Sequence, residues 1–357
     1  MKEEIRVSAE DLKSFVTGVL TSLALPLDEG RIIADTLVEA DLRGAGSHGV
    51  MRLVTYVRRV KAGGIKVPAE VRMIQEGPAT ALLDGGAGFG QIAAFRAAEV
   101  AMQKALNCGV GVVGVKNSSH FGRAGYYAEM IAKRDMIGVC MSNASPRLAP
   151  WGGKEAMLGN NPFSIAVPST DRIVVLDMAT SVAALGKMRL AAQQGLPIPP
   201  GWALDREGNP TTDPLAAVDG ILLPFGEHKG YGITLMVGFM CGILTGACWD
   251  PDVKPIDDFA RTQGLGHLLM AVRIDSFMLP QRFKERVAEA IERLKNCPKT
   301  SGQSEIFLPG EQGSIKRELY LKQGVPLAKS TVASLNKLAE ELRVPPLKVM
   351  DPFYPNK

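Results

Sequence analysis

The spacing of apolar residues predicts a helix near the start of the chain. Ser8 stands three residues before Asp11, a hydroxyl and an acid in the capping-box arrangement. Apolar residues then recur three or four positions apart: Leu12, Phe15, Val16, Val19, Leu20 and Leu23. A second helix is predicted over residues 28–42, and the glycines of segment 44–49 end it.

From about residue 67 the pattern changes to alternating strands and helices. The predicted strands are 80–84, 111–115, 137–143, 163–168 and 173–178, and helices are predicted over 91–106 and 124–133. Segments 195–201 and 205–214 are rich in Gly and Pro, so we interpret them as surface loops. An apolar helix follows over 230–245.

Helices return at the end of the chain, over residues 280–296 and 330–343, the second capped by Ser330. We therefore predict an α/β fold of two lobes. A sheet-based lobe, residues 71–274, is inserted in a helical lobe that both chain ends build, residues 1–70 and 275–357.

One glycine pattern is misleading. Segment 109–114 reads G-V-G-V-V-G, the letters of a Rossmann fingerprint. That motif needs a strand before it and a helix after it, whereas here a helix precedes and a strand follows. We reject the match and predict that Gly109 ends the helix. Segment 84–90 has the strand-loop-helix order, but its irregular glycine spacing favours a plain turn over a phosphate loop.

Candidate chemistry gathers where predicted segments end. The strand 111–115 runs into a polar cluster around His120, and imidazole titrates near neutrality, which suits an acid/base as well as a structural histidine. The turn at Ser47 and His48 is followed by Arg52 and Tyr56, four positions apart on one helical face. A surface Arg52 and a core Tyr56 are the alternative interpretation.

Two more loops carry polar groups. Asp177 ends a predicted strand and is followed by Thr180 and Ser181, and the ends of strands are where α/β sheets place ligands. His228 and Lys229 lie among glycines before the apolar helix, which suits a polar or anionic ligand, although the two could also simply cap a turn.

Composition narrows the class of protein. The chain has 357 residues, 46% of them apolar and 22% charged, with a net charge of +4 and basic residues interleaved with acids. We therefore expect small-molecule partners, with no nucleic acid and no membrane. Five Cys without a CxxC pair and no apolar leader segment favour a reducing, cytoplasmic location. The four His lack metal-ligand spacing, so we expect no metal site.

Five motifs in order resemble one family. They are Ser47-His48-Gly49 with Arg52, Asn117 to Gly122, Asn160-Asn161-Pro162, Asp177 to Ser181, and His228 to Gly232. Together they resemble the malate/L-lactate dehydrogenase family of the non-Rossmann type, over residues 8–344. This family includes ureidoglycolate, sulfolactate and diketogulonate oxidoreductases and a piperideine-2-carboxylate reductase. The resemblance implies hydride transfer between NAD or NADP and C2 of a small 2-hydroxy or 2-keto acid, by a homodimer.

The resemblance also implies roles for particular residues. His120 is the acid/base, with Asp177 and His48 as further catalytic groups. Arg52 holds the substrate carboxylate, beside Ser47 and Tyr56. The implied cofactor-binding residues are His48, Asn161, Pro162, Met178, Ala179, Thr180, Lys229, Gly310 and Glu311. Leu53, Glu227 and Asn161 depart from the common family pattern, and the last two bear on cofactor preference.

Three rival functions are weighed against this one. Reduction of a cyclic imine acid needs the same carboxylate anchor and hydride donor. A non-catalytic nucleotide-binding relative would not need His120 together with Arg52 and Asp177. A zinc enzyme would need clustered ligands, which the scattered His do not provide.

Overall fold

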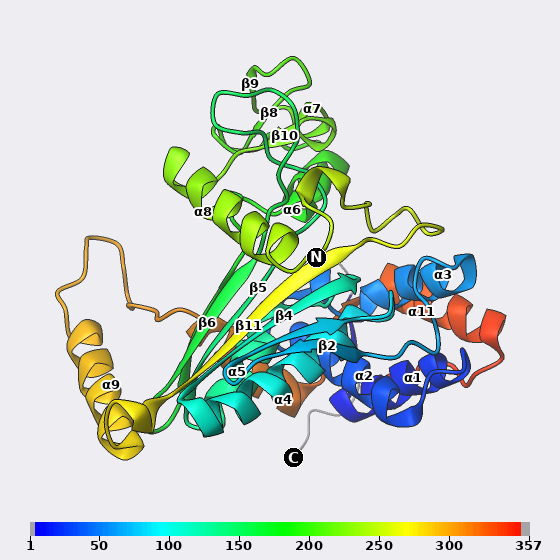
Figure 1. Cartoon of the computed structure of the whole chain (residues 1–357). Coiled ribbons are helices and arrows are strands. Elements are labelled where there is room, and N and C mark those ends of the chain that lie inside the picture. The colour runs from blue at the N-terminus through cyan, green and yellow to red at the C-terminus, as the bar shows by residue number, and fades with distance from the viewer. Residues whose placement is uncertain (1–3, 351–357) are drawn as a thin grey trace.

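A seven-stranded mixed sheet forms the centre of the computed structural model, which describes residues 4–350 (Figure 1). Its strand order is β2-β3-β4-β11-β5-β6-β7. The strands are β2 (Arg72–Glu76), β3 (Thr80–Asp84), β4 (Val110–Ser118), β5 (Met136–Ser142), β6 (Phe163–Pro168), β7 (Ile173–Met178) and β11 (Leu265–Arg273). The five predicted strands are confirmed, with small changes at the ends of β4 and β5, whereas β2 and β11 were not predicted.

The strand directions bring the candidate motifs to one edge of the sheet. β3 and β4 are parallel, and the antiparallel pairs β4-β11, β11-β5, β5-β6 and β6-β7 make β5 and β7 run the same way. The carboxyl ends of these four strands therefore share an edge. β11 begins there, because His267 pairs with Ser142. This is the edge at which open α/β sheets bind ligands.

Two helices cover one face of the sheet, α4 (Gly90–Cys108) and α5 (Ala124–Ala132) (Figure 1). A core of small apolar side chains, many of them Ala of α4, packs them closely against the strands. Gly109, with φ of +80°, ends α4 immediately before β4. The rejection of the Rossmann match is therefore confirmed, because the helix precedes the strand.

The helices of both chain ends pack together beside the sheet. They are α1 (Ala9–Thr21), α2 (Leu27–Leu42), α3 (Leu53–Ala62), α10 (Glu311–Gln323) and α11 (Lys329–Leu342). Antiparallel strands β1 (Glu4–Val7) and β12 (Val325–Ala328) join the two ends. Ser8 accepts from the backbone N of Asp11, as predicted. The Ser330 cap was wrong, because α11 already begins at Lys329 and has no side-chain cap.

The helix α9 (Pro280–Lys295), which the sequence grouped with the helical lobe, lies against the sheet. Its residues Phe283 and Val287 line an apolar cavity of about 510 Å³ with Val167 of β6 and Val174 of β7. The predicted lobe boundaries stay a prediction, with α9 on the sheet side.

A small unit projects from the sheet (Figure 1), with α6 (Leu185–Gln194), α7 (Pro214–Asp219), β8 (Ala203–Leu204), β9 (Pro210–Thr211) and β10 (Ile221–Leu222). The three short strands form their own sheet, over an apolar cluster that includes Met188 and Leu222. The loops predicted at 195–201 and 205–214 thus belong partly to an ordered unit. The apolar helix is α8 (His228–Gly238), continued by a π-helical turn (Phe239–Ile243).

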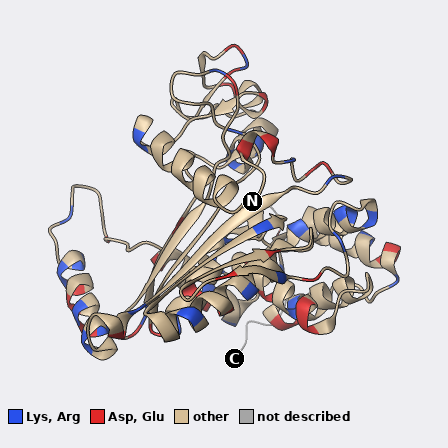
Figure 2. Cartoon of the chain, in the orientation of Figure 1, with Lys and Arg blue, Asp and Glu red and all other residues tan. Residues whose placement is uncertain are grey.

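Charged residues of both signs alternate along the helices, most visibly on α9 (Figure 2). The remaining short elements are 3₁₀ turns: Gly46–His48, Val50–Arg52, Asp250–Asp252 and Ile274–Ser276. Among the described helices, none is long and apolar enough to cross a membrane.

Candidate active site

His120 lies just beyond the end of β4, at the sheet edge where the motifs gather. Its backbone N donates to the side-chain oxygen of Gln263, at 2.9 Å. The N-terminus of α4 presses against this segment, and a Cβ at Gly90 would lie 1.9 Å from the carbonyl oxygen of Ser119. Only glycine permits this approach. The loop that carries His120 is therefore held by the protein before any ligand binds.

The Ser-His turn of segment 46–52 brings a second imidazole to the same place. The buried carboxylate of Asp41 accepts from the backbone N of Val50, at 2.7 Å, and so fixes the turn. The rings of His48 and His120 stack, with centroids 5.5 Å apart. The Nδ1 atom of His48 lies 3.0 Å from the hydroxyl of Ser47. The predicted grouping of the three residues is thus present in the structure.

Arg52 is poised beside these rings. Its Nε donates to the carbonyl oxygen of Ser47, at 2.7 Å. Within residues 4–350, its two terminal nitrogens have no hydrogen-bond or ion-pair partner. A guanidinium held at Nε, with two free parallel donors, is the arrangement that binds a carboxylate in a bidentate manner.

Tyr56 is fully buried, and its hydroxyl is taken by protein atoms. It lies 2.7 Å from Nδ1 of His120 and 2.9 Å from Nε2 of Gln91, which donates to it. Tyr56 therefore contacts the acid/base candidate directly, and its link to a substrate stays a prediction. Arg59, on the same helical face, is buried among backbone carbonyls and has a structural role.

Both site histidines are disposed to be neutral. Burial lowers the pKa of His48 to about 4, helped by the charges of Arg52 and Arg123. Burial also lowers the pKa of His120 well below its usual value, and His48 and Arg52 add to this shift. A neutral imidazole has a nitrogen lone pair, so the site is built to hold a base.

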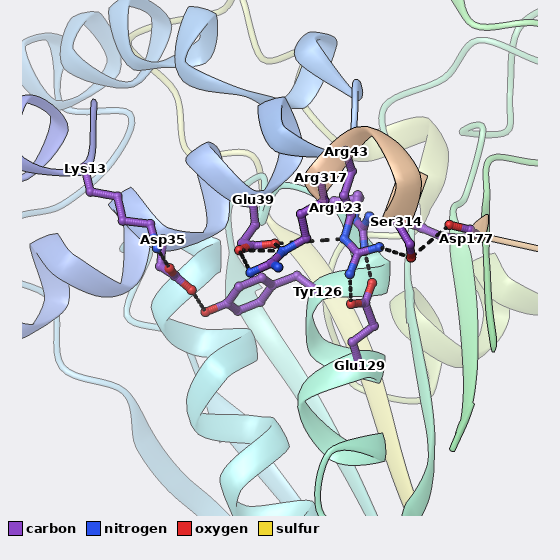
Figure 3. A network of polar contacts seen from close by, with 11 residues as sticks. Lys13, Asp35, Glu39, Arg43, Arg123, Tyr126, Glu129, Asp177, Ser314 and Arg317 are labelled. Atoms are coloured by element: carbon purple, nitrogen blue, oxygen red, sulfur yellow. Dashed lines mark hydrogen bonds and ion pairs between the residues drawn. The ribbon is translucent and has the colours of Figure 1, made fainter. Parts of the chain in front are cut away.

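Asp177 lies in a network of charges away from His120 (Figure 3). Its carboxylate pairs with Nε of Arg123, at 3.2 Å, and accepts from the backbone N of Gly125. Arg123 and Arg43 both contact Glu129. None of the interactions found for Asp177 in the described chain reaches His120. The geometry favours Asp177 as a group that orients Arg123, and its catalytic role stays a prediction.

Comparison with known proteins gives the class of the site. Residues 7–336 match the malate/L-lactate dehydrogenase family. A malate dehydrogenase of Pyrococcus horikoshii is 42% identical over 348 residues, which cover 95% of this chain and 96% of the relative. The chain belongs to the malate/L-lactate dehydrogenase family. The resemblance stated from the motifs is thereby confirmed.

Two further relatives extend the match. A ureidoglycolate dehydrogenase (NAD(+)) of Escherichia coli K12 is 32% identical over 325 residues, 90% of this chain and 93% of the relative. The solved structure of sulfolactate dehydrogenase from Methanocaldococcus jannaschii superposes with a TM-score of 0.91 at 37% identity, covering 95% and 98% of the two chains. Membership confirms the predicted enzyme class, a hydroxyacid dehydrogenase that uses a nicotinamide cofactor, and the predicted α/β, non-Rossmann fold.

In this family member, unpaired hydroxyls at the end of β7 fit a polar ligand such as that cofactor. The side-chain oxygens of Thr180 and Ser181 are buried without a hydrogen-bond partner in the described chain. Buried hydroxyls without partners are rare, which makes them candidate ligand contacts. The backbone of Thr180 bonds to Asn160 and Phe225, so the three predicted loops meet here. Met178 and Ala179 lie beside them, half-buried.

Lys229 adds an available cation to this cluster. It is exposed in the first turn of α8, and no ion pair was found for it among residues 4–350. Asn161 differs, because its buried side chain bonds to Ala144, Thr234 and Asp250. The structure thus gives the Asn161 amide internal partners, next to Pro162, whose carbonyl accepts from Ser142. Cofactor contacts of both residues stay predictions.

The last predicted cofactor contact, Gly310 and Glu311, packs on β7. A Cβ at Gly310 would lie 2.8 Å from the carbonyl oxygen of Val175. The carboxylate of Glu311 contacts Lys295 at 2.6 Å and Arg172 at 3.1 Å. Gly310 lines a cavity of about 270 Å³ together with Arg43, Arg123 and Asp177. This polar hollow is separate from the ring cluster around His120.

Sequence reasoning missed three residues that shape the site: Gln91, Gln263 and His267. His267 is fully buried, with Nδ1 on Ser142 and Nε2 on Ser118, both at 2.8 Å. Two signals were present in the sequence, a lone Gln91 in an apolar helix start and a lone His267 in an apolar run. Neither signal names a partner, because the partners lie far away along the chain.

Proposed function

We propose that this enzyme transfers a hydride between NAD or NADP and C2 of a small 2-hydroxy or 2-keto acid, such as a malate-, lactate- or ureidoglycolate-like substrate. His120 serves as the acid/base and Arg52 as the carboxylate anchor. The observation that carries the proposal is the pairing of two free groups at one sheet edge. Nε2 of His120 and the terminal nitrogens of Arg52 have no partner within the described residues.

The two free groups match the two demands of the chemistry. When a 2-hydroxy acid is oxidised, its hydroxyl loses a proton as the C–H bond breaks, and Nε2 of His120 takes that proton. The bound nicotinamide supplies the hydride acceptor. Arg52 holds the carboxylate on the neighbouring carbon, which fixes C2 relative to the imidazole.

Substrate binding tunes the base. Arg52 is one of the charges that lower the pKa of His120. A bound carboxylate neutralises Arg52, so the pKa of His120 rises toward neutrality when substrate is present. The imidazolium that forms during oxidation is thus better stabilised in the complex than in the free enzyme.

The supports for the cofactor seat are the orphaned hydroxyl of Thr180 and the free ammonium of Lys229. Adjacent strands lie about 4.8 Å apart, so the four steps from β4 to β7 span about 19 Å. That span suits an extended dinucleotide, and it runs from His120 at β4 to Met178, Ala179 and Thr180 beyond β7.

A second copy of the chain is the partner that the surface supports. Phe277 and Leu279 are 78% and 77% exposed, and Leu244 is 71% exposed. Large apolar side chains at such exposure are typical of surfaces that another chain covers. A homodimer in solution, measured by light scattering, is the expected result, and a monomer at all concentrations would contradict it.

The test of the proposed function is a substrate panel. Purified enzyme is mixed with each reduced cofactor and with 2-keto acids, glyoxylate derivatives or cyclic imine acids, and loss of nicotinamide absorbance is followed. Turnover of at least one 2-keto acid, abolished in His120→Ala, is expected. Turnover of cyclic imines alone would replace the hydroxyacid assignment, and cofactor binding without any turnover would contradict an enzyme.

A further inference from the structure

A buried hydrogen-bond chain extends behind His120. Gln91 in the first turn of α4 and Tyr56 of α3 are both fully buried. Nε2 of Gln91 lies 2.9 Å from the hydroxyl of Tyr56, which lies 2.7 Å from Nδ1 of His120. Oε1 of the same Gln91 amide is buried and has no hydrogen-bond partner among the described residues. Burying an unpaired amide oxygen costs about 1–3 kcal/mol, so it calls for an explanation.

Counting protons along the chain supplies one. A phenol carries a single proton. If the Gln91 nitrogen donates to the oxygen of Tyr56, the phenol proton must go to Nδ1 of His120, and the neutral imidazole then carries its proton on Nε2. The backbone N of Gly122, 3.4 Å from Nδ1, favours the same tautomer. In this setting Nε2 has no lone pair and cannot act as a base.

The opposite setting makes His120 a base. If the Gln91 amide turns over, Oε1 accepts the phenol proton, and the oxygen of Tyr56 accepts from a protonated Nδ1 of His120. Nε2 then has a free lone pair and can take up a proton to give the imidazolium. One amide atom is partnered and one is not in either setting, so the turn creates no additional unpaired group.

We propose that Gln91 is a positioning residue for His120: acting through Tyr56, its amide selects the His120 tautomer, and Nε2 is free to accept a proton only when Oε1 faces Tyr56. The inference rests on the proposed role of His120 as the acid/base. Gln91 touches neither substrate nor cofactor in this account, and its influence passes entirely through the phenol.

Other groups also act on the titration of His120. They are His48, Arg52, His267 and Arg59. All four disfavour the imidazolium, and all four remain unchanged when Gln91 is replaced. A change in titration that follows Gln91 alone can therefore be assigned to the hydrogen-bond chain.

The experiment is a titration of ¹⁵N-labelled imidazoles by NMR in the cofactor-free protein, with His120 assigned by its absence from His120→Ala. Gln91→Glu offers Tyr56 an acceptor, so it should stabilise Nδ1–H and raise the pKa of His120 by about 1–3 units. Gln91→Met offers no acceptor, so it should keep the Nε2–H tautomer and lower the pKa. Shifts in opposite directions are the signature of tautomer selection.

Tyr56→Phe is the matched control, because it removes the phenol that links the other two residues. In that background, Gln91→Glu should leave the His120 pKa unchanged. A shift that survives Tyr56→Phe, or shifts of the same sign in both Gln91 variants, would overturn the proposal. If Gln91→Met does not fold, Gln91→Glu with and without the phenol decides alone. The titration needs no turnover, so a failed substrate panel with an obeyed titration would remove the function and leave the hydrogen-bond chain.

Discussion

His120 and His267 lie at the same sheet edge and resemble each other closely, yet only one is equipped for chemistry. Each has Nδ1 at a hydroxyl, that of Tyr56 at 2.7 Å and that of Ser142 at 2.8 Å respectively. The ring of His267 stacks on Phe121, the residue after His120. The difference is at Nε2, which Ser118 occupies in His267 and which no described residue occupies in His120.

This difference shows which feature marks a functional histidine. Burial is the main cause that lowers the pKa of His267, to about 3, and it is also the main cause for His120. A depressed pKa therefore does not separate the two. A free ring nitrogen beside Arg52 does, because acid/base chemistry needs an unoccupied nitrogen and an anchored substrate.

The comparison breaks most directly when each ring is removed. His120→Ala should lower kcat by about 10²–10⁴-fold and leave the melting temperature nearly unchanged, because it deletes only the acid/base. His267→Ala should lower the melting temperature, because two buried hydroxyls lose their partner. Steady-state kinetics and thermal unfolding of both variants measure the split. A similar loss of kcat and stability in the two variants would erase the distinction.

Arg52 sharpens the comparison from the substrate side. Arg52→Ala should lower kcat/KM for the acid by an amount equivalent to about 2–5 kcal/mol, because the carboxylate loses a bidentate partner. Arg52→Lys should recover only part of this loss. Arg58→Ala, on the exposed side of α3, is the matched control and should behave as wild type. Cofactor affinity should stay the same, and a selective loss of cofactor binding would reverse the assignment.

The structural histidine should reveal itself in stability against pH. The pKa of His267 is about 3 when folded and 6.5 when unexposed to these contacts, so the unfolded chain binds the extra proton between these values. Stability should therefore fall with falling pH by about 1.4 kcal/mol per unit from this group. His267→Gln should flatten that slope in denaturant titrations, whereas His228→Gln, at an exposed position, should keep it. An unchanged slope would contradict a neutral His267.

Asp41, which holds the Ser-His turn, should show the opposite sign. Burial raises its pKa from 3.8 to about 7, so the folded state binds the extra proton and stability falls as pH rises between these values. Asp41→Asn removes the buried charge and keeps an acceptor for Val50. We expect the variant to be more stable by about 1 kcal/mol at pH about 8, and no more stable at pH about 4. A variant that is less stable at both pH values would show that Asp41 is needed as a charge.

Local pattern in the sequence was enough for the parts of the fold that depend on neighbours along the chain. The strands β3 to β7 and helices α1, α2 and α9 follow from apolar spacing. The central strand β11 was missed because its pairing with β4 and β5 joins residues about 150 positions apart in sequence. Ser330 misled the prediction, because tertiary packing begins α11 one residue earlier.

The site was predictable to the same degree. Ser47, His48, Arg52 and His120 were named from their motifs, and the structure brings them together. Tyr56 was expected at the substrate, but its hydroxyl bonds to His120, since α3 turns that face inward. Gln91 could not be paired with Tyr56 from sequence, because 35 residues separate them and only the packing of α3 against α4 joins them.

The central claim, that His120 carries the proton, is tested most directly by the pH dependence of hydride transfer in a single turnover of substrate oxidation. In the wild type, the rate should fall as pH drops through the His120 pKa, because protonation removes the base. In His120→Ala, the remaining slow rate should be independent of pH in that range, while His267→Gln should keep the wild-type profile. A wild-type rate and profile in His120→Ala would contradict the account.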